Sequence, residues 1–78
     1  MKRITIVVVS GETGAWDIRI KPGTTATDIL AALKLPGYVL VPVSNPDRVF
    51  SKKEDVYPQV SSGDDLCAIN STTYYLYF

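Results

Sequence analysis

The stretch AWDIRIKPGTTATDILAALK, residues 15–34, decides the fold because two hydrophobic periods follow each other within it. Residues 15–21 carry an apolar side chain at every second position from Trp16 to Ile20, which predicts a β-strand with one buried face. From Thr24 onward the apolar residues recur at helical spacing, at positions 26, 29, 30 and 33. Pro22-Gly23 separates the two periods. The sequence therefore predicts a strand that leads directly into a short helix.

Both ends of this helix carry recognisable signals. Thr25 followed by Asp28 has the spacing of a capping box, in which a hydroxyl and a carboxylate satisfy free backbone N–H groups. Lys34 suits the negative end of the helix dipole, and Pro36-Gly37 is expected to stop the helix. A helix of about ten residues does not persist alone in water. We therefore expect its apolar stripe to pack on a sheet.

Toward the N-terminus, residues 2–10 predict a second strand, joined to the first by a turn at 10–14 that contains two glycines. The alternation assigns its side chains to two faces. Facing the helix we expect Ile4, Ile6 and Val8, together with Trp16, Ile18 and Ile20. Facing away from it we expect Thr5, Val7 and Val9.

Toward the C-terminus, the sequence predicts strands at 38–43 and 66–69, with 49–50 as a very short edge strand. In the 38–43 strand, Val39, Val41 and Val43 are expected to share the helix-facing side, opposite Leu40. Residues 51–60 are polar and irregular. The aromatic segment 70–78 is rich in strand-forming residues and is expected to be an extended tail of a single domain that spans 1–78.

The order of hairpin, helix, strand, short strand and strand resembles the β-grasp, or ubiquitin-like, arrangement. Three segments are similar to parts of the small bacterial sulfur carriers of thiamin and molybdopterin synthesis. They are Lys21-Pro22-Gly23-Thr24-Thr25 with Ile29-Leu30-x-x-Leu33 and Leu35-Pro36-Gly37, the strand and turn at 39–49, and Val60-x-x-Gly63-Asp64-x-Leu66. The resemblance implies an α+β fold, a two-layer β-grasp of order ββαβ(β)β. In it, one helix packs on one face of a mixed four- to five-stranded sheet.

The sequence departs from that family after Gly63, which is its last glycine. Ubiquitin and the sulfur carriers end in Gly-Gly, because the tail must thread a narrow channel of an activating enzyme. Here Tyr74-Tyr75-Leu76-Tyr77-Phe78 stands at that place. Two functions stay open. The first is a ubiquitin-like protein-interaction module without enzymatic activity. The alternative is a modifier or sulfur carrier whose Gly-Gly end is absent from this chain.

The composition excludes several chemistries. With no His and one Cys, the chain cannot form a Ser–His–Asp triad, a Cys–His pair or a four-cysteine metal site. With 8 basic and 8 acidic residues, it has no long-range attraction to nucleic acid or anionic membranes. No apolar run approaches the ~20 residues of a membrane span. We expect no catalytic residue, no cofactor, no metal, no nucleic-acid or membrane partner, and a cytoplasmic location.

The remaining polar candidates have simpler explanations than a site. Cys67 lies in a predicted strand beside Asp64-Asp65, which would raise its pKa, so we expect a passive thiol. Adjacent carboxylates such as Glu54-Asp55 diverge, so turn formation and solubility explain them. Arg3, Arg19 and Lys21 are expected to form a solvated face with Asp17.

The candidate binding residues lie on the sheet face that a single helix leaves open. Exposed apolar patches of this kind mark binding sites. The predicted protein-binding residues are Val7, Val9, Tyr38 and Leu40 on the sheet, with Tyr75 and Tyr77 on the tail. Two alternatives stay open here. The patch binds another protein, or the C-terminal tail folds back over the patch. In either case we expect Tyr74, Leu76 or Phe78 to be buried, in this chain or in a partner, and the chain to be a monomer or weak dimer.

Overall fold

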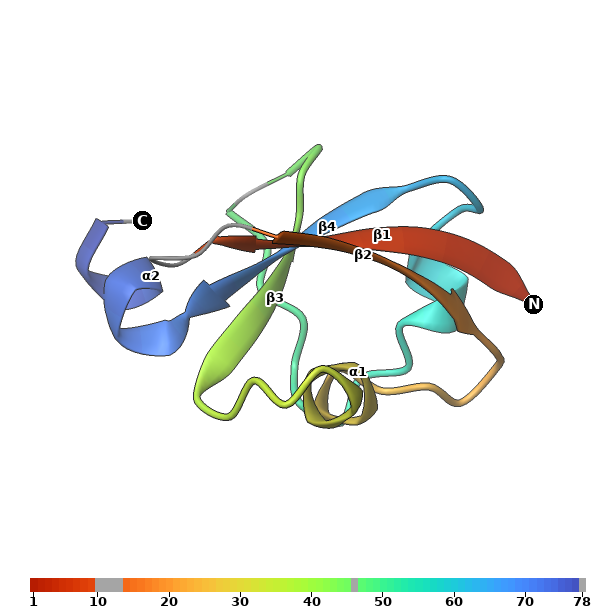
Figure 1. Cartoon of the computed structure of the whole chain (residues 1–78), viewed down its shortest axis with the longest axis horizontal. Coiled ribbons are helices and arrows are strands. Elements are labelled where there is room, and N and C mark those ends of the chain that lie inside the picture. The colour runs from red at the N-terminus through yellow and green to blue at the C-terminus, as the bar shows by residue number, and fades with distance from the viewer. Residues whose placement is uncertain (10–13, 46, 78) are drawn as a thin grey trace.

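A computed structural model of the chain describes residues 1–9, 14–45 and 47–77. Figure 1 shows how its elements are arranged. In chain order they are β1 (Lys2–Val9), β2 (Gly14–Ile20), α1 (Ala26–Ala32), β3 (Tyr38–Pro42), a 3₁₀ turn (Tyr57–Gln59), β4 (Asp65–Asn70) and α2 (Ser71–Tyr77). The hairpin of β1 and β2 is as predicted, and residues 10–13 of its turn lie outside the described residues.

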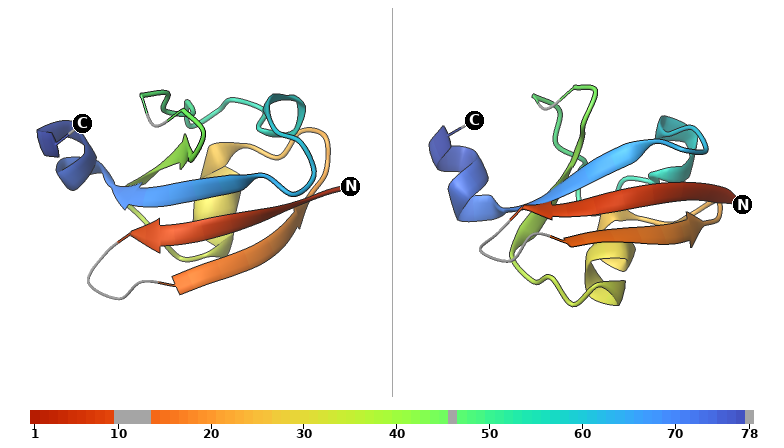
Figure 2. Two further views of the ribbon diagram at one scale, coloured as in Figure 1. Left: turned by 90° about the horizontal axis from the view of Figure 1, so that it is seen from above. Right: turned by 45° about the horizontal axis from the view of Figure 1, so that its top comes forward.

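The strands of the described residues form one four-stranded sheet in the order β2-β1-β4-β3. β1 runs antiparallel to β2 and parallel to β4, and β3 runs antiparallel to β4. α1 lies against one face of this sheet (Figure 2, left), where the strands pass in front of it. We call the opposite side the open face. The predicted two-layer α+β architecture with a mixed sheet is therefore confirmed.

α1 begins at the predicted capping box. The Thr25 hydroxyl accepts from the Asp28 backbone N–H at 3.2 Å, and the Asp28 carboxylate accepts from the Thr25 N–H at 3.1 Å. The helix ends earlier than predicted, because Lys34 adopts a left-handed conformation with φ 57°. Leu35 N–H then donates to the Leu30 carbonyl at 2.9 Å, which closes a Schellman motif. A lysine therefore holds the position that glycine usually occupies.

The main core fills the space between α1 and the sheet. Its buried residues are Ile4, Ile6, Val8, Ile20, Ala26, Ile29, Leu40, Phe50, Val56, Val60, Leu66 and Ala68. Trp16 pairs with Ile6 and so lies on the predicted helix-facing side, yet it is 55% exposed. The reason is that β2 is an edge strand and α1 lies nearer to β3.

The predicted faces of β3 are wrong. Leu40 is fully buried in the main core, whereas Val41 packs on the open face. Because Leu40 pairs with Ala68, and Ala68 with Val8, these three side chains share the helix-facing side. Tyr38 lies two residues before Leu40 and packs half-buried against the same core. Neither Leu40 nor Tyr38 therefore belongs to the open face.

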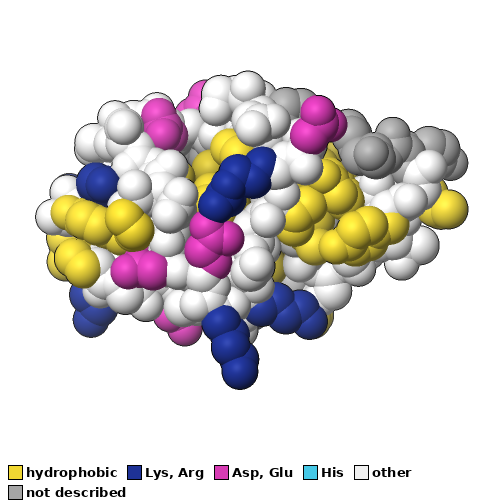
Figure 3. Space-filling view, turned by 180° about the vertical axis from the view of Figure 1, so that it is seen from behind, with side chains coloured by type: hydrophobic (Ala, Val, Ile, Leu, Met, Phe, Trp, Pro, Cys, Tyr) yellow, Lys and Arg dark blue, Asp and Glu magenta, His cyan; other side chains and the backbone are white. Residues whose placement is uncertain are grey.

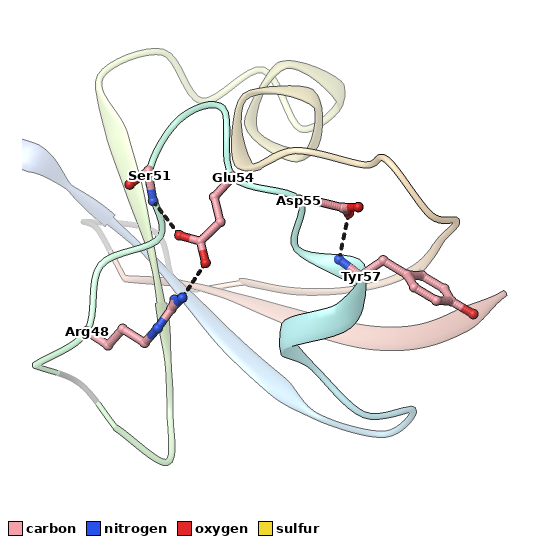
Figure 4. A network of polar contacts seen from close by, with 5 residues as sticks. All are labelled: Arg48, Ser51, Glu54, Asp55 and Tyr57. Carbon is pink, nitrogen blue, oxygen red and sulfur yellow. Dashed lines mark hydrogen bonds and ion pairs between the residues drawn. The ribbon is translucent and has the colours of Figure 1, made fainter.

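The segment between β3 and β4 is held by polar contacts rather than by the predicted edge strand. Phe50 N–H donates to the Leu40 carbonyl at 3.0 Å. Glu54 accepts from Arg48 and from the Ser51 N–H, and Asp55 accepts from the Tyr57 N–H (Figure 4). The adjacent carboxylates of Glu54 and Asp55 thus hold different parts of the loop. Hydrogen bonding from Arg48 lowers the pKa of Glu54.

The C-terminal segment 71–77 is helix α2, so the predicted extended tail is wrong over these residues. The Asn70 side chain accepts from the Thr72 N–H at 3.0 Å, as a helix N-cap does. Ser71 N–H donates to the Gly37 carbonyl at 2.8 Å. These two bonds turn the chain out of β4 into a helix that lies beyond the end of the sheet (Figure 1).

Candidate protein-binding face

The strand register places the side chains of the open face in rows across β1, β4 and β3. The first row is Val9, Ile69 and Val39, and the second is Val7, Cys67 and Val41. Asp65 and Thr5 start a third, polar row. One half of the open face is therefore apolar, and it is the half next to α2.

α2 covers part of this apolar half. Tyr74 is 5% exposed and forms a small buried cluster with Val41 and Ile69. Half-buried Val39, Val49 and Cys67 pack around the cluster. The prediction that Tyr74, Leu76 or Phe78 is buried, in this chain or in a partner, is confirmed for Tyr74 in this chain, whereas Leu76 is 71% exposed. Phe78 lies outside the described residues.

The rest of the apolar half is accessible. Val9 is 45% exposed and Val7 is half-buried, and both lie on the predicted open face. Tyr75 is 71% exposed on α2. Tyr77 ends α2, and its side chain lies outside what the structure describes. The accessible patch thus combines the end of β1 with the helix, and its role in binding stays a prediction.

A charged border adjoins the patch at the start of β1 and at the residues opposite it on β2. Arg3 Nη2 donates to Asp17 Oδ2 at 3.2 Å, and Thr5 Oγ1 donates to Asp17 Oδ1 at 2.7 Å. The hydrogen bond from Thr5 is the largest cause that lowers the pKa of Asp17, and the bond from Arg3 lowers it further. Arg19 pairs with Arg3 across the strands and adds a second positive charge. The open face therefore passes from an apolar end to a charged end.

The described residues hold no obvious reactive group on this face. Cys67 is half-buried, and its burial, followed by the charge of Asp65, raises the pKa of the thiol. The thiol is therefore protonated at neutral pH, when it is a poor nucleophile. In the same residues no three metal-ligating side chains gather. No helix of the described chain is long and apolar enough to cross a membrane.

Comparison with solved structures identifies the fold. The chain is similar to the ubiquitin of Caldiarchaeum subterraneum, with a TM-score of 0.67 and 22% identity over 88% of this chain and 91% of that chain. The chain has the ubiquitin-like β-grasp fold. It is also similar to a ubiquitin-like protein from the same hyperthermophilic archaeon, with a TM-score of 0.55 and 24% identity over 87% of this chain and 94% of that one. No protein-family model and no curated protein matches the sequence.

On the side of this ubiquitin-like domain opposite to Figure 1, hydrophobic side chains gather in separate groups with charged side chains between them, and one group lies toward the α2 end (Figure 3). The sequence analysis placed Val7 and Val9 on the open face and named Tyr75 and Tyr77 as binding residues, but it expected these two tyrosines on an extended tail and not on a helix. Asn70-Ser71-Thr72, a good N-cap sequence, was the signal that could have revealed the helix.

Proposed function

We propose that this ubiquitin-like chain is a protein-interaction module without enzymatic activity, and that it binds a partner protein through the open face. The observation that carries the proposal is the accessible patch of Val7 and Val9, which α1 leaves uncovered. An apolar centre with a charged border is the usual anatomy of a protein interface. Here the border is the exposed Arg3–Asp17 ion pair.

α2 supports this proposal because it packs on the apolar half of the open face through Tyr74 and carries an exposed aromatic side chain. The rings of Tyr74 and Tyr75 meet edge to face, with their centroids 5.3 Å apart. Tyr74 seats the helix on the sheet, while Tyr75 stays 71% exposed. Tyrosine is enriched at binding hot spots since it combines a large apolar surface with a polar end. We include Tyr75 and Tyr77 in the proposed binding surface.

Photo-crosslinking tests the proposed surface. A benzoylphenylalanine probe replaces Val9 in one sample and Gln59, an exposed residue of the 3₁₀ turn, in the control. In cells of the source organism, we expect a discrete protein adduct with the probe at position 9 and none with the probe at position 59. A Val7→Asp change in the position 9 sample should abolish the adduct. Equal adducts at both positions, or none at position 9, would contradict the proposal.

The alternative is a ubiquitin-like modifier or sulfur carrier, which the fold shared with the archaeal ubiquitin favours. Against it stands the helical segment 71–77, which packs on the sheet through Tyr74 instead of forming a free tail. Incubation with an activating enzyme and ATP separates the two functions. An adenylate or thiocarboxylate at the C-terminal carboxyl group, detected by mass spectrometry, would establish the alternative and reject the interaction module.

The setting we infer for this module is the cytoplasm, where a single thiol such as Cys67 stays reduced. We further infer that the chain binds neither nucleic acid nor membranes, since its formal net charge is zero, and that it is a monomer or weak dimer. Sedimentation of the chain alone, and then with a DNA duplex or anionic vesicles, tests both statements. Co-sedimentation with either probe would contradict them.

A further inference from the structure

A second apolar surface lies on the helix side of the sheet, away from the open face. It is a hollow of about 360 Å³ between the exposed side of α1, the connection from α1 to β3, and the loop at Lys52. We call it the α1 hollow. Its apolar lining is Leu30, Ala31, Leu35, Pro36 and Tyr38. Leu30, Leu35 and Tyr38 are only half-buried, so the hollow exposes apolar surface that the main core does not use.

Hydrogen bonds hold the walls of the α1 hollow in place. The Thr27 N–H and hydroxyl both donate to the Lys52 carbonyl, at 3.1 and 2.8 Å, and so fasten the loop to α1. The Schellman bond from Leu35 to Leu30 holds the connection at the other wall. The hollow is thus formed before any ligand arrives, which reduces the entropy lost on binding.

Two cations stand at the rim of the α1 hollow, and no acidic residue lines it. They are Lys34 and Lys52, both exposed, and neither forms an ion pair within the described residues. Lys34 is held at the rim by the left-handed end of α1. The whole chain has no net charge, so the positive charge at this rim is a local feature. The two lysines place it beside the apolar lining of the α1 hollow.

We propose that the α1 hollow binds a peptide segment of a partner protein, one that carries a bulky apolar residue next to an aspartate or glutamate. An apolar cavity of about 150 Å³ holds a benzene ring, so a hollow of this size accepts an aromatic or leucine side chain with part of its neighbours. The flanking carboxylate would then meet Lys34 or Lys52. This site does not depend on the open face, so each proposal can fail without the other.

Selection from a random displayed peptide library tests this proposal with the whole chain as bait. We expect the selected peptides to share an apolar residue flanked by Asp or Glu. In NMR titrations, the shifts should centre on the amides of Leu30, Ala31 and Leu35, and leave those of Val7 and Val9 unchanged. Selected peptides that lack the acidic residue, a selection that yields no shared motif, or shifts on the open face would overturn the proposal.

Variants make the test specific. The double variant Lys34→Asn/Lys52→Gln removes both rim charges, and asparagine tolerates the left-handed conformation at position 34. It should weaken binding of the selected peptide about fivefold, since exposed ion pairs are weak. Lys53→Gln is the matched control, because Lys53 has the same charge in the same loop but does not line the hollow. Ala31→Glu, at an exposed helix position, should weaken binding more than tenfold by filling and recharging the hollow. If Lys53→Gln weakens peptide binding as much as the double variant at Lys34 and Lys52 does, the two rim lysines do not bind the carboxylate of the peptide as proposed.

A second copy of the chain is the main competing occupant, since Trp16 presents a 55% exposed aromatic ring on the edge strand β2. Sedimentation of the chain over a concentration series distinguishes the two. Self-association that both Ala31→Glu and Trp16→Ser abolish would assign the hollow to a second copy and overturn the partner peptide. A monomer at all concentrations supports the partner peptide.

Discussion

Replacing Tyr74 by alanine should detach α2 without unfolding the rest of the domain. Tyr74 is 5% exposed, and it is the α2 residue in the buried cluster with Val41 and Ile69. A buried aromatic residue covers about 150–250 Å². At about 25 cal/mol per Å², that burial is worth roughly 4–6 kcal/mol before any opposing term.

The opposing term is the ordering of the helix. Fixing the backbone of the seven residues of α2 costs about 1–2 kcal/mol each, or roughly 7–14 kcal/mol in all. Helical hydrogen bonds return only about 1 kcal/mol each. α2 is therefore docked by a small margin and depends on Tyr74. Its loss should lower the free energy of unfolding by about 1–3 kcal/mol, less than the ~3–5 kcal/mol of an aromatic residue lost from a main core.

Hydrogen exchange and urea denaturation measure the two parts of this prediction. In Tyr74→Ala the amides of 72–77 should lose their protection, while those of β4 keep theirs. Tyr75→Ala makes the same chemical change one residue away, at an exposed position, and should lower the free energy of unfolding by no more than about 1 kcal/mol, the worth of its ring contact with Tyr74. Equal losses in the two variants, or protected α2 amides in Tyr74→Ala, would refute the reasoning.

Four further predictions follow from named contacts. Leu40→Ala should lower the free energy of unfolding by about 3–5 kcal/mol in urea denaturation, because Leu40 is fully buried, whereas Val9→Ser at a 45% exposed position should lower it by far less. Lys34→Gly should raise the free energy of unfolding by about 1 kcal/mol, since glycine adopts the left-handed conformation of Lys34 without strain. The melting temperature should rise accordingly, and an unchanged melting temperature would contradict this. Because the Arg48 contact lowers the pKa of Glu54 in the folded state, the stability it provides is present at neutral pH and is lost as pH falls below about 4.3 toward that lower pKa. Glu54→Gln should remove this part of the pH dependence measured by thermal unfolding, and a variant with the same acid limb as the wild type would disprove it. Cys67 should react with a thiol reagent at pH 8 more slowly than free cysteine, and more slowly than in the urea-unfolded chain, because burial raises its pKa; equal rates in the folded and unfolded chain would contradict the burial of the thiol.

Several features of the fold could be predicted because local chemistry alone specifies them. The alternation around Trp16 predicts a strand, and Thr25 with Asp28 predicts the start of a helix, whatever the rest of the chain does. The order of these elements was enough to predict a β-grasp. In the candidate site, Val7 and Val9 were placed on the correct face because Ile4, Ile6 and Val8 alternate with them over a long strand.

The two faces of β3 could not be predicted in the same way. Its residues are apolar on both sides, so period-two alternation does not distinguish the core from the open face. Only the pairing of Leu40 with Ala68 decides that Leu40 is buried under α1. The exposure of Trp16 depends likewise on the position of β2 at the sheet edge, which no local pattern contains.

The C-terminal segment likewise differs between what its local sequence favours and what its tertiary contacts decide. Its tyrosines and threonines favour a strand, but the Asn70 cap and the seat of Tyr74 on Val41 and Ile69 make residues 71–77 a helix. By itself the sequence determined the hairpin, the capped helix and the order of elements, because these depend on neighbours within a few positions. Tertiary structure decided which apolar residues stay accessible, at Val9, at Tyr75 and in the α1 hollow. Accessibility depends on what packs from distant parts of the chain.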